Sequence, residues 1–286
     1  MRRLDLIEVE DQAAMPSVNL RTADDLLPSL QFPTALHRQV AEIARDLFAA
    51  HPQVDTVLVV NSCARGQAVP GSDLDLAVLI KPATASQEVQ DLEMRWHDFK
   101  ATQPLVRQFR SGGRFRQVHL DLFDGRMVPT VWDDGGGPDS LEIEIGNRMA
   151  YAVPLHEAGA GFRQLRAQWL PYYADELRLR RLAMVREACA CDLDTIPFYL
   201  NRGLHFQAFD RLYKAFREFL QALFIARRTY PLAYNKWIRE QVTDWLALPE
   251  LYRELPPILS MRNMESTEVG EKADALRALL ERWISA

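Results

Sequence analysis

The pattern of apolar residues changes near residue 161. Before that position, short β-branched apolar runs are separated by turns that contain Gly and Pro. After it, apolar residues recur at helical spacing over long segments. Charge divides at the same place, because residues 1–161 carry 15 basic and 23 acidic side chains whereas residues 162–286 carry 19 and 16. The sequence therefore predicts the α+β class, with a small mixed-sheet domain followed by an α-helical bundle domain.

We expect three parts, namely an N-terminal arm over 1–32, the sheet domain over 33–161 and the helical domain over 162–286. A helix is predicted from Pro33 to about Ala50, and another over 88–100. Strands are predicted over 54–60, 74–80 and 117–123. The segment 141–152 is ambiguous between strand and helix, and an edge strand is favoured because Leu and Ile alternate there with Glu. The second part predicts helices near 162–170, 172–190, 204–228, 234–247 and 268–284.

Overall composition excludes several classes of protein. The net charge of −5 argues against bulk coating of nucleic acid. The longest apolar runs fall far short of the ~20 residues that a membrane helix needs, and acidic residues interrupt the first twelve positions. Three cysteines lack the spacing of a zinc site. We expect a cytoplasmic protein with reduced thiols.

Two carboxylates, Asp73 and Asp75, stand at the start of the predicted strand over 74–80. The period of two along a strand puts both on one face, with Leu74 on the other. Adjacent carboxylates repel each other unless a cation lies between them, and oxygen ligands suit Mg²⁺. A solvated strand entry is the alternative interpretation.

A small polar turn, Asn61-Ser62-Cys63-Ala64-Arg65-Gly66, follows the preceding buried strand. Backbone N–H groups, the Ser62 hydroxyl and the Arg65 guanidinium could together bind phosphate. Alternatively, Ser62 caps a helix and Arg65 is solvated. A third carboxylate, Asp121, lies on a later alternating strand and is expected to face the first two, as metal ligand or general base. His119 has the same parity, although a structural role is the simpler interpretation for it.

Asn61-Ser62, Asp73-x-Asp75 and Asp121 together resemble the nucleotidyltransferase superfamily of the DNA polymerase β type. The run from Asn61 to Gly66 followed by Ser72-Asp-Leu-Asp75 is similar to its bacterial antibiotic-modifying branch, which includes kanamycin, streptomycin and lincosamide nucleotidyltransferases. The sequence departs from the family at Asn61, where the family usually has Gly. Asn is the ordinary residue that best tolerates the left-handed backbone region, so the turn is compatible with it.

The resemblance implies transfer of a nucleoside monophosphate, AMP from ATP or the equivalent from another NTP, to a hydroxyl acceptor with release of pyrophosphate. It implies two Mg²⁺ ions on Asp73, Asp75 and Asp121. Nucleotide contacts are implied for a second group of polar residues, namely Asn61, Ser62, Arg65, Ser72, Lys214 and Lys236. Solvated lysines are the alternative for the last two.

The acceptor is less constrained than the donor. The acidic first part suits a cationic, aminoglycoside-like molecule. Three alternatives stay open: a catalytically silent nucleotide-binding regulatory module, a protein- or RNA-modifying enzyme of the toxin–antitoxin type, and a helical adaptor.

Overall fold

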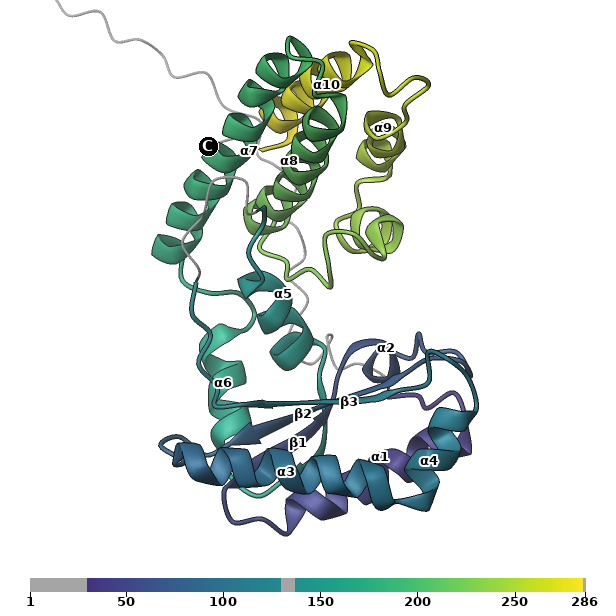
Figure 1. Cartoon of the computed structure of the whole chain (residues 1–286). Helices are drawn as coiled ribbons and strands as arrows, with labels where there is room; N and C mark the ends of the chain where they lie inside the picture. Colours follow the sequence, from purple (N-terminus) through teal and green to yellow (C-terminus); the bar gives the residue numbers. More distant parts are fainter. Residues whose placement is uncertain (1–29, 130–136, 285–286) are drawn as a thin grey trace, which may run out of the picture.

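A four-stranded mixed sheet forms the centre of the first part of the chain (Figure 1). A computed structural model describes residues 30–129 and 137–284, so the arm expected over 1–32 lies almost wholly outside the described residues. The strands, in the spatial order β3-β2-β1-β4, are β1 Val54–Val59, β2 Leu74–Ile80, β3 Val118–Phe123 and β4 Val153–Glu157. Strand β1 is antiparallel to β2 and β4, whereas β3 runs parallel to β2. The end of β1 and the beginnings of β2 and β3 therefore share one end of the sheet.

Helices cover both faces of this sheet. One face packs on α1 (Ala35–Ala49), α3 (Ser86–Thr102) and α4 (Pro104–Ser111). The other packs on α5 (Leu141–Ile145), the π-helical turn η1 (Gly146–Ala150) and α6 (Gly161–Trp169). Because side chains alternate along a strand, Leu74 and Leu76 enter the first core and the odd-numbered residues of β2 point to the second face.

The second part of the chain is a helical bundle above the second face (Figure 1). Its elements are α7 Asp175–Leu200, α8 His205–Ala226, the π-helical turn η2 Glu240–Trp245, α9 Pro249–Ile258 and α10 Glu268–Trp283. These elements share one apolar core. The α+β class with a mixed sheet and a helical C-terminal part is thus confirmed. None of the helices within residues 30–129 and 137–284 has the length and apolar composition that crossing a membrane requires.

A buried ionic cluster joins the sheet side to the bundle. Glu142 of α5 is fully buried and accepts from Arg181 Nε at 2.5 Å, Arg181 Nη2 at 2.8 Å, the Tyr173 hydroxyl at 2.7 Å and Gln221 Nε2 at 2.9 Å. Arg181, itself 3% exposed, also donates to Asp139 at 2.7 Å. Two helices of the bundle, α7 and α8, are thereby anchored on α5.

The edge strand predicted over 141–152 is wrong, because this segment is α5 followed by η1, and the edge strand β4 begins only at Val153. The alternation of Glu with Leu and Ile suggested a strand with one solvent-exposed face. Glu142 is instead buried against Arg181, and Leu141 and Ile145 form the apolar side of a helical turn. Only the ion pair, which the local pattern does not contain, distinguishes the two interpretations.

Two helix predictions also needed correction, and two helices were missed. Helices α4 and α9 were not predicted, and the helix expected over 172–190 continues to Leu200. The helix expected over 234–247 is reduced to the turn η2 and its flanks. There the Gln241 side chain accepts from Leu232 N–H and donates to the Ala233 and Lys236 carbonyls, which wraps the preceding segment around it.

Asp55, a buried carboxylate in β1, fixes the start of α6. Its oxygens accept from the N–H groups of Gly161 and Phe162 at 3.2 Å, where the helix dipole favours an anion. A Cβ at Gly159 would lie 2.1 Å from Asp55 Oδ2, so the chain can approach this closely only as glycine. Helix α6 therefore packs on the sheet, and the division of domains predicted at residue 161 stays a prediction.

Candidate functional site

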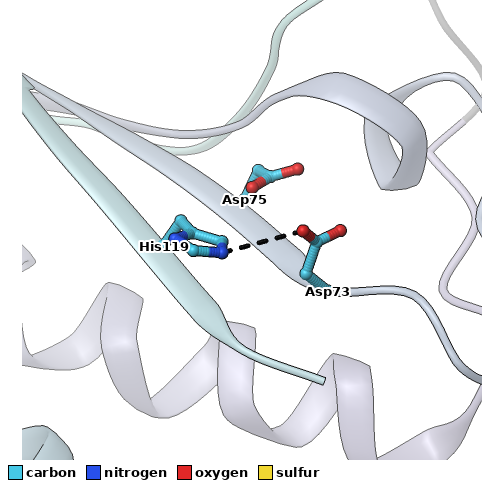
Figure 2. A group of neighbouring side chains, drawn as sticks. All are labelled: Asp73, Asp75 and His119. Atoms are coloured by element: carbon cyan, nitrogen blue, oxygen red, sulfur yellow. Dashed lines mark ion pairs between the residues drawn. The ribbon is translucent and has the colours of Figure 1, made fainter. Parts of the chain in front are cut away.

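Asp73, Asp75 and His119 converge at the end of the sheet where β2 and β3 begin (Figure 2). Asp75 is directly opposite His119 in the parallel β2–β3 register, and Asp73 lies one residue before β2. One ligand atom from each residue lies within 4.8 Å of the others, and His119 Nε2 is 3.7 Å from Asp73 Oδ2. Two carboxylates and an imidazole at this separation form a donor set for one divalent cation.

The electrostatics of this group favour a cation. Burial, the neighbouring Asp73 carboxylate and, more weakly, Asp121 raise the pKa of Asp75 above its ordinary value, while a hydrogen bond from the Asn61 side chain and the nearby His119 lower it. A positive ion between the carboxylates would remove the repulsion. Asn61, predicted as a phosphate contact, thus also contacts Asp75.

The polar turn after β1 is the short helix α2 (Asn61–Ala64). Asn61 has φ 57°, so it occupies the left-handed backbone region, which Asn tolerates better than most residues. Ser62 is half-buried at the first turn, and its carbonyl accepts from Gln67 N–H at 2.9 Å. Burial and the two nearby aspartates raise the pKa of Cys63 to about 12, so this thiol stays protonated and structural.

Ser72 shapes the turn that leads into Asp73. Its hydroxyl accepts from Val69 N–H at 3.0 Å, and its own N–H donates to the Val69 carbonyl at 2.8 Å. His37 of α1 is fully buried and places Nε2 3.1 Å from the Ser72 carbonyl oxygen. Helix α1 therefore holds the backbone directly before Asp73 through His37. A phosphate contact of Ser72 stays a prediction.

Arg65 reaches from the end of α2 to the helical part. Its Nη2 lies 2.7 Å from Glu240 Oε1, and its guanidinium stacks near Trp237 and Trp245, at 5.4 and 5.6 Å from the ring centroids. Only 7% of the Arg65 side chain is exposed. The phosphate contact predicted for Arg65 stays a prediction.

Asp121 lies on the same face of the sheet as the carboxylate pair, but it is opposite Ala77 rather than Asp75. Its side chain is 69% exposed, and Arg148 Nη2 lies 3.9 Å from its Oδ2. Among the described residues, the group with metal-ligand spacing contains His119 and not Asp121. The register predicts this exchange, because residue 119 and not residue 121 is level with Asp75.

The two lysines predicted as nucleotide contacts lie in the helical part. Lys214 of α8 pairs with Asp210 one turn earlier, at 2.9 Å. Lys236 is exposed and precedes Trp237, which packs on Arg65, so it lies near α2. Their contacts with a nucleotide stay predictions. Sequence reasoning did not find Glu240, whose partner Arg65 is 175 positions earlier.

The comparisons with known proteins are distant. No family model matches the chain, and no curated protein matches it. Among solved structures, a nucleotidyltransferase-like protein from Exiguobacterium sibiricum is similar over 86% of this chain and 74% of that chain, with 13% identity and a TM-score of 0.44. The chemistry of the site has to be read from its own residues.

Proposed function

We propose that this chain is a divalent-cation-dependent nucleotidyltransferase that moves a nucleoside monophosphate, AMP from ATP in the simplest case, onto a hydroxyl acceptor. The observation that carries the proposal is the convergence of Asp73, Asp75 and His119 beside the polar turn α2. The motif spacing that resembles the DNA polymerase β type supports the same chemistry.

Asp73 and Asp75 would hold Mg²⁺, with His119 as a third donor on the exposed side. The donor set fits, because the three ligand atoms lie within 4.8 Å of one another and Asp75 has a carboxylate neighbour whose repulsion a cation would relieve. When bound, the cation would neutralise charge on the α-phosphate and the leaving pyrophosphate. A second ion near Asp121 belongs to this proposal.

In the reaction, the acceptor oxygen forms a bond to the α-phosphorus while the bond from that phosphorus to the α,β-bridging oxygen breaks. The bonding pair leaves with pyrophosphate, and Asp121 accepts the hydroxyl proton. Asp121 suits this task because it is exposed on the face of the sheet that carries Asp75. Asn61 and Ser62 would contact the phosphates of the NTP.

The competing regulatory-module hypothesis predicts NTP binding without turnover. Asp73 and Asp75 repel each other when no cation is bound, and a cation-dependent enzyme needs such a pair to hold its metal ion. A cationic, aminoglycoside-like acceptor is the candidate that the net charge favours. The cytoplasmic location also belongs to the proposal.

Thermal unfolding with each of the four NTPs, with and without Mg²⁺, tests the donor site, because a ligand of the native state raises the melting temperature. We expect an upward shift with one NTP and Mg²⁺ that Asp73→Asn abolishes. The matched control is Asp124→Asn, an exposed carboxylate in the turn after β3. Pyrophosphate release in an acceptor screen then separates an enzyme from a silent module. Full turnover by Asp73→Asn would refute the assignment.

A further inference from the structure

A basic segment precedes β3. Between Asp98 and Asp121 the sequence has no Asp or Glu, although residues 1–161 as a whole are strongly acidic. Lys100 lies over the Trp96 ring on α3 and is set apart from the others. We call the other arginines of this segment and the exposed aromatic residue among them the basic rim, which consists of Arg107, Arg110, Arg114, Phe115 and Arg116. Arg107, Arg110 and Arg114 are exposed, whereas Arg116 is half-buried.

The basic rim has a fixed shape. Arg107 and Arg110 are three residues apart on α4, so they share one side of the helix and both are exposed. The Arg116 guanidinium lies 4.5 Å from the centroid of the Phe109 ring, and a Cβ at Gly112 would lie 1.9 Å from Arg116 Nη1. The loop therefore packs on Arg116. Phe115, 76% exposed, stands out from it.

The charges of the basic rim have no counter-ions among the described residues. No carboxylate there forms an ion pair with any of its four arginines, and the one side-chain hydrogen-bond partner is Gln117, which accepts from Arg110 Nε at 3.1 Å. The guanidinium groups of Arg107, Arg110 and Arg114 are exposed and can therefore bind an external anion, and their planar shape suits phosphate.

The basic rim is attached to the candidate active site. The carbonyl of Gln117, the residue after Arg116, accepts from Leu74 N–H at 2.9 Å, directly beside Asp73. His37 forms a second link, because its ring meets Phe109 edge-on with centroids 4.7 Å apart while its Nε2 approaches the Ser72 carbonyl. Helices α4 and α2 lie at the same end of the sheet (Figure 1).

We propose that the basic rim binds a single-stranded nucleic acid, which presents its terminal hydroxyl as the acceptor. This inference rests on the proposed function and names its acceptor class. The arginines would bind successive phosphates, and Phe115 would stack on an unpaired base, a combination that suits flexible single strands. β3 is the outer strand of the sheet, so a strand held on the rim can reach the exposed face that carries His119 and Asp121. The local charge near the site, and not the net charge of the whole chain, then selects the acceptor.

Fluorescence anisotropy tests this with a labelled 12-nucleotide single-stranded RNA of mixed sequence, the same sequence as DNA, and a polyglutamate peptide of similar charge. The full chain is used without NTP or divalent cation, over a range of salt concentrations. Three phosphate contacts, from the exposed arginines Arg107, Arg110 and Arg114, predict a slope of log K against log salt concentration of about −2.1. Arg107→Gln/Arg114→Gln should make it shallower by about 1.4.

The matched control is Arg180→Gln/Arg253→Gln, which removes the same charge from exposed positions of α7 and α9 and should leave the slope unchanged. Phe115→Ala should weaken nucleic-acid binding by about 5- to 150-fold and leave polyglutamate binding unaffected, because the peptide has no base to stack. Comparison of the RNA and DNA arms identifies the kind of strand.

The proposal is overturned if neither strand binds, if both arginine pairs change the slope equally, or if polyglutamate binds as tightly as RNA and Phe115→Ala has no effect. The last result would assign the rim to an acidic protein. Because binding is measured without NTP, these failures are distinct from failure of the NTP-dependent melting shift. A chain that shifts with NTP but ignores both strands would keep its proposed activity and lose this acceptor.

Discussion

Replacing Glu142 with Gln tests whether the buried ionic cluster joins the sheet to the bundle. Gln has nearly the same shape, but it carries no charge and places an NH₂ group among donors from Arg181, Tyr173 and Gln221. Breaking a buried ion pair costs about 3–5 kcal/mol, since the remaining charge stays buried. Asp139 still pairs with Arg181, so we expect the lower end, about 3 kcal/mol.

The shift in melting temperature reports how much of the chain unfolds together. Using the usual entropy of unfolding per residue, about 3 kcal/mol corresponds to roughly 5 °C if the whole chain unfolds as one unit, and to roughly 10 °C if the bundle unfolds by itself. Calorimetry gives the melting temperature, and urea titration gives the free energy of unfolding.

Glu254→Gln is the matched control, because Glu254 pairs with Arg282 at 2.6 Å on the surface, with 42% of its side chain exposed. An exposed pair contributes at most about 1 kcal/mol. The double variant Arg181→Met/Glu142→Gln should lose less than the sum of the two single variants, because neither charge then remains without its main partner. Equal, small losses for Glu142→Gln and Glu254→Gln would refute the reasoning.

Asp75→Asn should raise the free energy of unfolding of the metal-free chain at neutral pH. The fold raises the pKa of Asp75, so ionisation of this carboxylate destabilises the native state as the pH rises above the ordinary pKa of 3.8. Urea titrations should therefore show that the variant's gain in free energy of unfolding becomes smaller towards pH 4. A gain that persists at pH 4 would contradict this explanation. His119→Asn should weaken Zn²⁺ binding by about tenfold or more and Mg²⁺ binding less, because imidazole favours zinc; calorimetric titrations that show equal losses would exclude His119 as a ligand. Gly159→Ala should cost roughly 1–3 kcal/mol by displacing Asp55, whereas Gly71→Ala, with nothing within 4 Å of its Cβ, should cost under about 0.5 kcal/mol; equal urea midpoints would contradict the close approach.

Local pattern was enough to predict the strands that carry the site. Strand β2 has the predicted bounds because its run from Leu74 to Ile80 is, apart from Asp75, apolar and buried on both faces of the sheet. Asn61 could be predicted to adopt a positive φ because few other residues tolerate it. Such features depend on neighbours within about ten residues, and the sequence displays those neighbours directly.

Long-range pairing accounts for what the sequence did not predict. Glu142 looked like the wet side of a strand because its partner Arg181 is 39 positions away. His119 looked structural because only the β2–β3 register places it opposite Asp75. Arg65 looked solvated or open to phosphate because Glu240 and the two tryptophans come from the far end of the chain. In each case the local sequence around one residue did not predict its distant partner.

The seat of α6 on Asp55 offers a way to identify relatives of this chain. Because the carboxylate leaves no room for a side chain at residue 159 and little at residue 161, we expect the three positions to vary together among homologues. A homologue that keeps an acid in the middle of its first strand must keep both glycines about a hundred residues later, and one that loses the acid is free to vary them. Joint change at these three positions could therefore help to identify relatives of this chain whose overall sequence identity is too low for recognition.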